Sequence, residues 1–204
     1  MGRDAGVDQI VAAVEAAEKQ TSAEFVVALE PQSGSYRDID VLFAAGLNFV
    51  LLLLAIFSPV TIDQQWFPLN QAILFGLAWG FSAHTPYVRR IFCSAERLEQ
   101  QAIEKAQLLF HNQEVSQTRG RTGVMVLVSQ LERRVVVAAD SGVMRAVESD
   151  EWEAFTAKIQ MTYDGKDLSA TAAKSVQDLG DFLAEPLPVS DDDIDELSNV
   201  PTLH

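Results

Sequence analysis

Two long apolar runs interrupt a chain whose other segments mix apolar and polar positions. The first occupies residues 41–58 and the second residues 66–83, and neither contains a charged side chain. A helix of about 18 residues rises about 27 Å, which is close to the thickness of the hydrocarbon layer of a bilayer. The short connection at residues 59–65 makes two such helices antiparallel neighbours. The pattern predicts a transmembrane helical hairpin that occupies, with its flanks, residues 39–88.

The alternative interpretation is a pair of helices buried in a soluble core. The second run is the less apolar of the two, because Pro68, Asn70 and Gln71 dilute its first turn. A small domain could hardly cover two such helices on every face, however. The membrane hairpin is therefore the preferred interpretation.

Basic residues beside the two runs indicate how the hairpin is oriented. Arg37 precedes the first run, Arg89, Arg90 and Arg97 follow the second, and the connection between them has neither Lys nor Arg. Flanking Lys and Arg are retained on the cytoplasmic side of a membrane. We expect both ends of the hairpin, and both termini with them, to face the cytoplasm.

The segments outside the runs have the periodicities of soluble helices and strands. A strand expected at residues 24–29 cannot form a stable sheet alone, so we expect it to join strands at residues 122–129 and 134–139. Residues 1–38 and 89–188 are then two parts of one α/β domain. An acidic tail follows at residues 189–204, with too few apolar residues to pack alone. Helices are expected before residue 21, over residues 94–111, after Ser149, and over residues 168–184.

Composition narrows the class of partner. The net charge of −14 argues against nucleic acid, because phosphate binding requires surplus Lys and Arg, and against polybasic attachment to anionic lipid. Cys93 is the single cysteine, so an intramolecular disulfide is excluded and a structural thiol is expected. The remaining candidates are the lipid bilayer and an integral membrane protein complex.

No familiar catalytic signature occurs in the sequence. The chain lacks the glycine-rich loops of nucleotide-binding proteins and the nucleophile and zinc motifs of common hydrolases. The three histidines, His84, His111 and His204, are scattered along it. Catalytic residues are thus unassigned. The acidic run at residues 191–196 could offer oxygens to a hard cation, and the alternative is a solvated tail without further function.

Short segments outside the hairpin follow one another in a distinctive order and spacing. They are Glu18-x-x-Thr21-x-x-Glu24-Phe-Val-Val, Phe110-His-Asn, Arg121-Thr-Gly-Val-Met-Val-Leu-Val-Ser, Glu132-Arg, Val-Val-Val-Ala-Ala-Asp140-x-Gly142, Trp152 and Asp193-x-Asp195-Glu-Leu-Ser-Asn199. Together they resemble the TPM domain family over nearly the whole chain outside the hairpin. The resemblance is closest to the bacterial membrane branch of that family, in which a helical hairpin interrupts the domain.

The resemblance implies an α/β sandwich, with a central sheet flanked by helices, interrupted by the transmembrane hairpin. It also implies a multi-pass protein of the bacterial inner (cytoplasmic) membrane. Some relatives bind calcium, and a site for Ca²⁺ or another divalent cation would fall to Asp140, Asp195 and Glu196. The chain departs from the family's closing motif where Asp195 stands for Asn and where Asn199 stands for Asp.

Three functional hypotheses follow. The leading one is a non-catalytic interaction or quality-control module for a membrane complex, anchored by the hairpin. The alternative is a metal-dependent, acid-phosphatase-like hydrolase, which the resemblance and the acidic clusters suggest. A calcium sensor without catalysis is the third.

Overall fold

The computed structural model describes residues 2–58, 65–160, 163, 166–189, 197 and 199–203. The chain divides into two compact units. One combines Met1–Ser33 with Glu99–His204, and the other is Gly34–Leu98.

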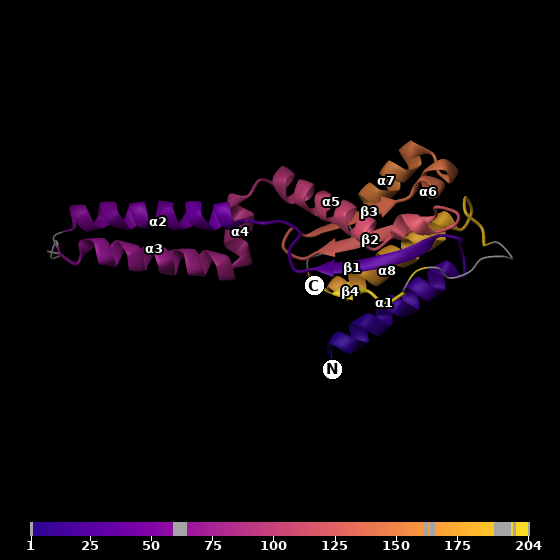
Figure 1. Ribbon diagram of the computed structural model, residues 1–204, viewed down its shortest axis with the longest axis horizontal. Coiled ribbons are helices and arrows are strands. Elements are labelled where there is room, and N and C mark those ends of the chain that lie inside the picture. The colour runs from indigo at the N-terminus through magenta and orange to yellow at the C-terminus, as the bar shows by residue number, and fades with distance from the viewer. Residues whose placement is uncertain are drawn as a thin grey trace. The chain divides into compact units, whose positions relative to one another are not determined.

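A small mixed sheet is the centre of the first unit. Its strands are β1 (Glu24–Glu30), β2 (Gly123–Ser129), β3 (Arg134–Ala139) and the two-residue β4 (Thr202–Leu203), in the order β3-β2-β1-β4 (Figure 1). β1 and β2 are parallel, whereas β2 and β3 are antiparallel. The prediction that the strand before the hairpin joins the strands after it is confirmed.

The two central strands are buried along their whole length. Their register is continuous from Glu24 opposite Gly123 to Glu30 opposite Ser129. Alternate side chains enter two different cores, with Phe25 and Val27 on one face of the sheet and Val26 and Ala28 on the other. Because both faces are covered, β2 reads as a continuous apolar run instead of an alternating one.

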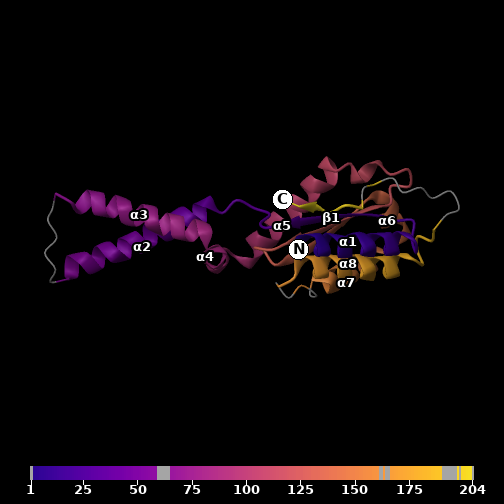
Figure 2. The same ribbon diagram turned by 90° about the horizontal axis from the view of Figure 1, so that it is seen from below.

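Helices cover both faces of this sheet, so the unit is a mixed α/β sandwich, as the sequence predicts. α1 (Gly2–Glu18), α7 (Ser149–Gln160) and α8 (Leu168–Leu183) contribute to the core on one face (Figure 2). The part of α5 (Ala95–Asn112) that belongs to this unit covers the other face, with the short helix η1 (Val115–Gln117). α1 and α8 approach closely at Gly180, where an added Cβ would lie 2.7 Å from the Cβ of Ala17.

The C-terminal segment differs from the predicted unpacked tail. Thr202 and Leu203 form β4 and pair with Ala28 and Leu29, and Leu197 packs against the core beneath α5. The free edge of β1 offers backbone hydrogen-bonding groups to any extended segment. A strand of two residues is too short to show a periodic pattern in the sequence, so the pattern did not predict β4. The short helices α4 (Pro86–Phe92) and α6 (Ser141–Ala146) were missed for a similar reason.

The second unit contains two long antiparallel helices, α2 (Arg37–Phe57) and α3 (Phe67–His84), which lie side by side (Figures 1 and 2). Small residues on their facing surfaces, Ala44, Ala78 and Ser82, are buried. Small side chains allow helix backbones to approach closely. The unit is therefore a helical hairpin, closed at its base by α4.

Two ion pairs join the segments at the base of the hairpin. Asp40 is buried and receives hydrogen bonds from Nη2 of Arg89 at 2.8 Å, from Nε of Arg89 at 3.1 Å and from Oγ of Ser82 at 2.8 Å. The second pair is more exposed: Arg97 contacts both carboxylate oxygens of Asp38, at 2.6 and 2.9 Å. Both pairs connect the start of α2 to residues that follow α3.

The buried pair makes the hairpin sensitive to acid. The hydrogen bonds from Arg89 hold the pKa of Asp40 below its ordinary value of 3.8, against the opposing effect of burial. A carboxyl group whose pKa is lowered on folding stabilises the fold above its unfolded pKa. That stabilisation is lost as the pH falls through the lower pKa of the folded state.

We predict that Asp40→Asn destabilises the chain by about 1–3 kcal/mol at neutral pH, because Arg89 loses its charged acceptor. Unfolding of the full chain in detergent micelles, followed by circular dichroism, measures this. The stability difference from the wild type should stay constant from neutral pH to about pH 5 and narrow below 3.8. Asp38→Asn is the matched control in the exposed pair and should cost at most about 1 kcal/mol. A difference that does not change with pH would contradict the assignment.

Candidate functional site

Asp140, one of the three predicted cation ligands, lies immediately after β3 and caps the short helix α6. Its Oδ1 accepts a hydrogen bond from the backbone N–H of Ser141 at 2.6 Å. Its own N–H donates to the carbonyl oxygen of Gly123 at 2.9 Å. The residue is 6% exposed, so its carboxylate is fixed and buried at this end of the sheet.

A second buried acid, Glu24, lies in register with this position. Gly123 pairs with Glu24 on one side and is bonded to Asp140 on the other. Side chains alternate along a strand, so both acids belong to the face that carries Val26. Gly123 has no side chain between them, and a Cβ there would lie 2.1 Å from the carbonyl oxygen of Val115. Two carboxylates therefore flank a position that only glycine fits.

The oxygens of Asp140 are not equivalent. Oδ2 is buried and accepts no hydrogen bond from the residues that the structure describes. Nη1 of the exposed Arg121 lies 3.8 Å from Oδ1. Leaving a carboxylate oxygen buried without a donor is costly. An oxygen of this kind suits a hard cation such as Ca²⁺, which prefers carboxylate ligands.

The predicted cation site is only partly accounted for. Asp195 and Glu196 lie outside the described residues. Within the described part of the chain, no three His, Cys, Asp or Glu side chains gather closely enough to hold a metal ion. Glu24 was not predicted as a ligand, and the signal that could have singled it out is an acid at the start of a buried strand. Of the three predicted ligands, the described residues therefore include Asp140 alone, and Glu24 is a neighbouring carboxylate by strand register.

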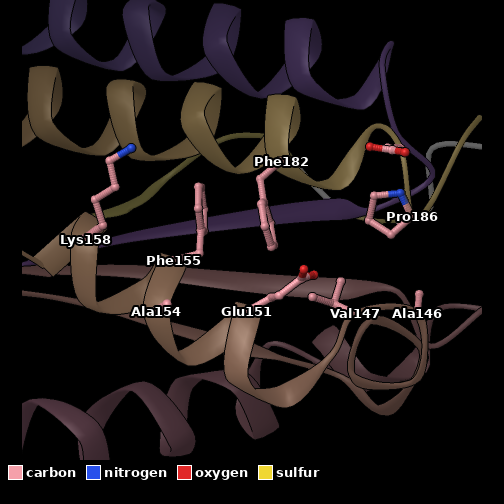
Figure 3. Close-up of a pocket in the computed structure, with 9 residues that line it drawn as sticks. Ala146, Val147, Glu151, Ala154, Phe155, Lys158, Phe182 and Pro186 are labelled. Carbon is pink, nitrogen blue, oxygen red and sulfur yellow. The ribbon is translucent and has the colours of Figure 1, made fainter.

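A groove between α7 and α8 is the other candidate site (Figure 3). Its volume is about 760 Å³. Phe155 of α7 and Phe182 of α8 stack in it, with ring centroids 4.0 Å apart and planes 10° apart. Val147 and Pro186 add to its apolar lining. The sequence does not show that the two helices leave a groove between these rings.

Charged side chains surround the stacked rings. Glu151 and Glu185 line the groove near Phe182, and Figure 3 shows the Glu151 carboxylate directed toward the space between the helices. A smaller cavity of about 290 Å³ shares Phe155, Phe182 and Lys158 with the groove and adds two further acids, Asp178 and Asp181. The two cavities form one apolar surface with a mainly acidic border.

Comparison with known proteins identifies a fold and no family. No family model matches the chain, and no curated protein sequence matches it. The NMR structure of the BA42 protein from the psychrophilic bacterium Bizionia argentinensis is similar in fold, with a TM-score of 0.57. That similarity covers 98% of this chain and 92% of the other, at 21% identity. The likeness supports the α/β fold alone, and membership of the TPM domain family stays a prediction.

Proposed function

We propose that this protein is a membrane-anchored interaction or quality-control module of the TPM type, held by its hairpin at the bilayer beside a membrane complex. The observation that carries the proposal is the exposure of the hairpin's apolar surface. α2 is the one helix in the described part of the chain that is long and apolar enough to cross a membrane. Of the 18-residue window of α2 that meets this test, 17% is buried. Large apolar side chains face outward along it, among them Leu42, Phe49, Leu54 and Phe57.

The exposure argues against the alternative explanations of such a helix. A core helix of a soluble protein is mostly covered, and contiguous exposed apolar surface of this extent is rare on soluble proteins. A secretory signal begins near the N-terminus, whereas α2 begins at residue 37, after a helix and a strand. The hydrocarbon interior of a bilayer would account for the exposed apolar side chains of α2.

The partner helix α3 is shorter and less apolar than α2. Its antiparallel contact with α2 supports a crossing by both helices, because the connecting residues 59–65 allow no long detour. Its exposed face also carries large apolar groups, including Ile73, Leu77 and Phe81. Arg37, Arg89 and Arg90 all lie at the base of the hairpin, which supports our proposal that both termini face the cytoplasm.

Anchoring at a membrane would favour an interaction with other membrane proteins. A domain held at the bilayer is confined with other membrane proteins, which raises the effective concentration of any partner in the same membrane. The net charge of −14 leaves a basic protein surface as the complementary partner and disfavours nucleic acid.

A second candidate function is the binding of a divalent cation, and the orphaned Oδ2 of Asp140 is the observation that favours it. Asp140 would be a ligand, and Glu24 is a neighbouring acid on the same face of the sheet by strand register. The acid-phosphatase-like hydrolase would need this cation and a further nucleophile, so ion binding is the step to test first.

For the anchor, we predict that alkaline carbonate leaves the full chain in the membrane pellet of expressing cells. Val50→Arg, in the middle of α2, should reduce the pelleted fraction because a central arginine costs about 3 kcal/mol on insertion. Leu108→Arg is the matched control, since Leu108 is exposed to a similar degree on α5. Release of the wild-type chain into the supernatant would contradict the anchor.

Reporter fusions extend this test to orientation. A fusion at residue 63 should report the far side of the membrane, and a fusion at His204 should report the cytoplasm. A cytoplasmic signal at residue 63 would overturn the proposed topology.

For the interaction role, we predict that the tagged full chain, solubilised in mild detergent, co-purifies reproducibly with an integral membrane protein. Chemical cross-linking in intact membranes before solubilisation should retain the same partner. Correctly folded, membrane-inserted protein that yields no reproducible partner would count against this role.

For the cation, we predict a saturable heat when CaCl₂ is titrated into the full chain in detergent, and its loss in Asp140→Asn. Removal of the carboxylate charge should abolish binding because carboxylates supply most of the affinity for Ca²⁺. Asp150→Asn, at an exposed acid of α7, should leave the heat unchanged. Equal heats for the wild type and Asp140→Asn would dismiss this site.

A further inference from the structure

We propose that the groove between α7 and α8 binds a peptide segment of a partner protein that carries Arg or Lys next to a large apolar side chain. The inference deepens the proposed interaction role and takes from it the expectation of a protein partner. The shape and charge of the groove do not depend on the membrane anchor. The groove is formed within the first unit, by residues of α6, α7 and α8 and their adjoining turns.

The floor of the groove is apolar and incompletely covered. Phe155 and Phe182 stack on each other at 4.0 Å and remain partly exposed beside Val147 and Pro186. Phe182 also borders the core, with its ring centroid 6.5 Å from that of the buried Trp152. Rings supported in this way form a rigid surface, and a large apolar side chain laid against them would remove further apolar area from water.

The charges around the floor select a basic partner. Four carboxylates, Glu151, Asp178, Asp181 and Glu185, line the two connected cavities against a single ammonium group, Lys158, which gives a formal net charge of −3. α8 also directs the negative end of its dipole to this region, and its last turn contains no basic residue. The negative potential at this end of α8 is thus left without a counter-charge in the last turn of the helix.

The residues at one end of the groove favour Arg in particular. Glu151 lies at the end that Phe182 and Pro186 border (Figure 3), and Glu185, which directly precedes Pro186 in the sequence, also lines the groove. A guanidinium group can pair with carboxylates while its flat face lies on an aromatic ring. The chain's own acidic run at residues 191–196 has the wrong charge for this place, which leaves a segment of another protein as the occupant.

The length of the groove fits a short segment. Glu151 and Lys158 lie seven residues apart on α7, so the groove extends about 10 Å along that helix. This is the length of about three residues of extended chain or two turns of helix. The volume of about 760 Å³ is that of a site for a few side chains.

The test is a titration of the full chain, in nanodiscs of phosphatidylcholine, against a fluorescent peptide with the core Arg-Phe-Leu-Arg between Gly-Ser flanks. Phosphatidylcholine headgroups carry no net charge, which limits electrostatic attraction of the peptide to the bilayer, and empty nanodiscs provide the baseline. Fluorescence anisotropy should show saturable binding that weakens with added salt. Peptides with Glu in place of Arg, or with Ala in place of Phe and Leu, should each bind at least about tenfold more weakly.

Two protein variants assign the binding to the groove. Glu151→Lys combined with Glu185→Lys should weaken the Arg peptide about tenfold and should bind the Glu peptide better than the wild type does. Glu153→Lys makes one such charge reversal at an exposed position of α7 outside the groove and should leave the affinity unchanged. Gain of binding by the Glu peptide also shows that the double variant is folded.

Two results would overturn the proposal: no saturable binding of the Arg peptide to the wild type, or equal binding to the wild type and the double variant. Failure of this test is distinguishable from failure of the proposed function. A chain that co-purifies with a membrane partner and ignores the peptide keeps its interaction role and loses this groove as the site. A chain that binds the peptide but is released by carbonate keeps the groove and loses the anchor.

Discussion

The parallel pairing of β1 with β2 is the constraint on which the rest of this structure depends. It joins residues 24–30 to residues 123–129, and everything between them in the sequence must leave the sheet and return to it. Both cores are built on this pair, since its alternate side chains supply one face under α1, α7 and α8 and the other under α5. β3 and β4 extend the sheet on either side but contribute fewer pairs.

Closing so long a loop has an entropic cost that grows with the number of flexible residues. An inserted segment that is already folded shortens the effective loop. The hairpin meets this condition through its own contacts: the packing of α2 against α3 and the buried bonds of Asp40 to Arg89 and Ser82. In a bilayer the hairpin would be stable before the strands pair, because its backbone groups are satisfied within each helix and its apolar side chains face lipid. The hairpin that we propose as a membrane anchor would then also favour folding of the sheet.

Much of the fold could be predicted from the sequence because its signals are local or follow from simple exclusion. The two uncharged runs give the helices of the hairpin, and the continuous apolar run of β2 gives a strand covered on both faces. A lone strand before the hairpin must find partners, so its pairing with later strands could be inferred without any local signal. The positions of β4 and α6 could not, because two residues of strand and six of helix carry no periodicity.

The candidate sites show the same division. Asp140 could be singled out because it belongs to a motif of the sequence. That its Oδ2 is buried without a hydrogen-bond donor could not be predicted, because it depends on how neighbouring loops pack. Glu24 reaches the same end of the sheet only through the register of β1 with β2. The groove depends on the angle and spacing of two helices whose apolar stripes look alike in sequence. Phe155 and Phe182 read as ordinary core residues, and only the packed structure leaves their rings at a surface with an acidic border.

The most direct test is to measure whether lipid or water surrounds α2. A nitroxide label placed at residue 49 of the full chain, in a Cys93→Ser background, reports collisions with oxygen and with a water-soluble nickel chelate by electron paramagnetic resonance. In lipid vesicles the account predicts frequent collisions with oxygen and few with the chelate, because oxygen concentrates in hydrocarbon and the chelate does not enter it. Chelate collisions as frequent as those of a label at the exposed residue 108 would place α2 in water and contradict the account.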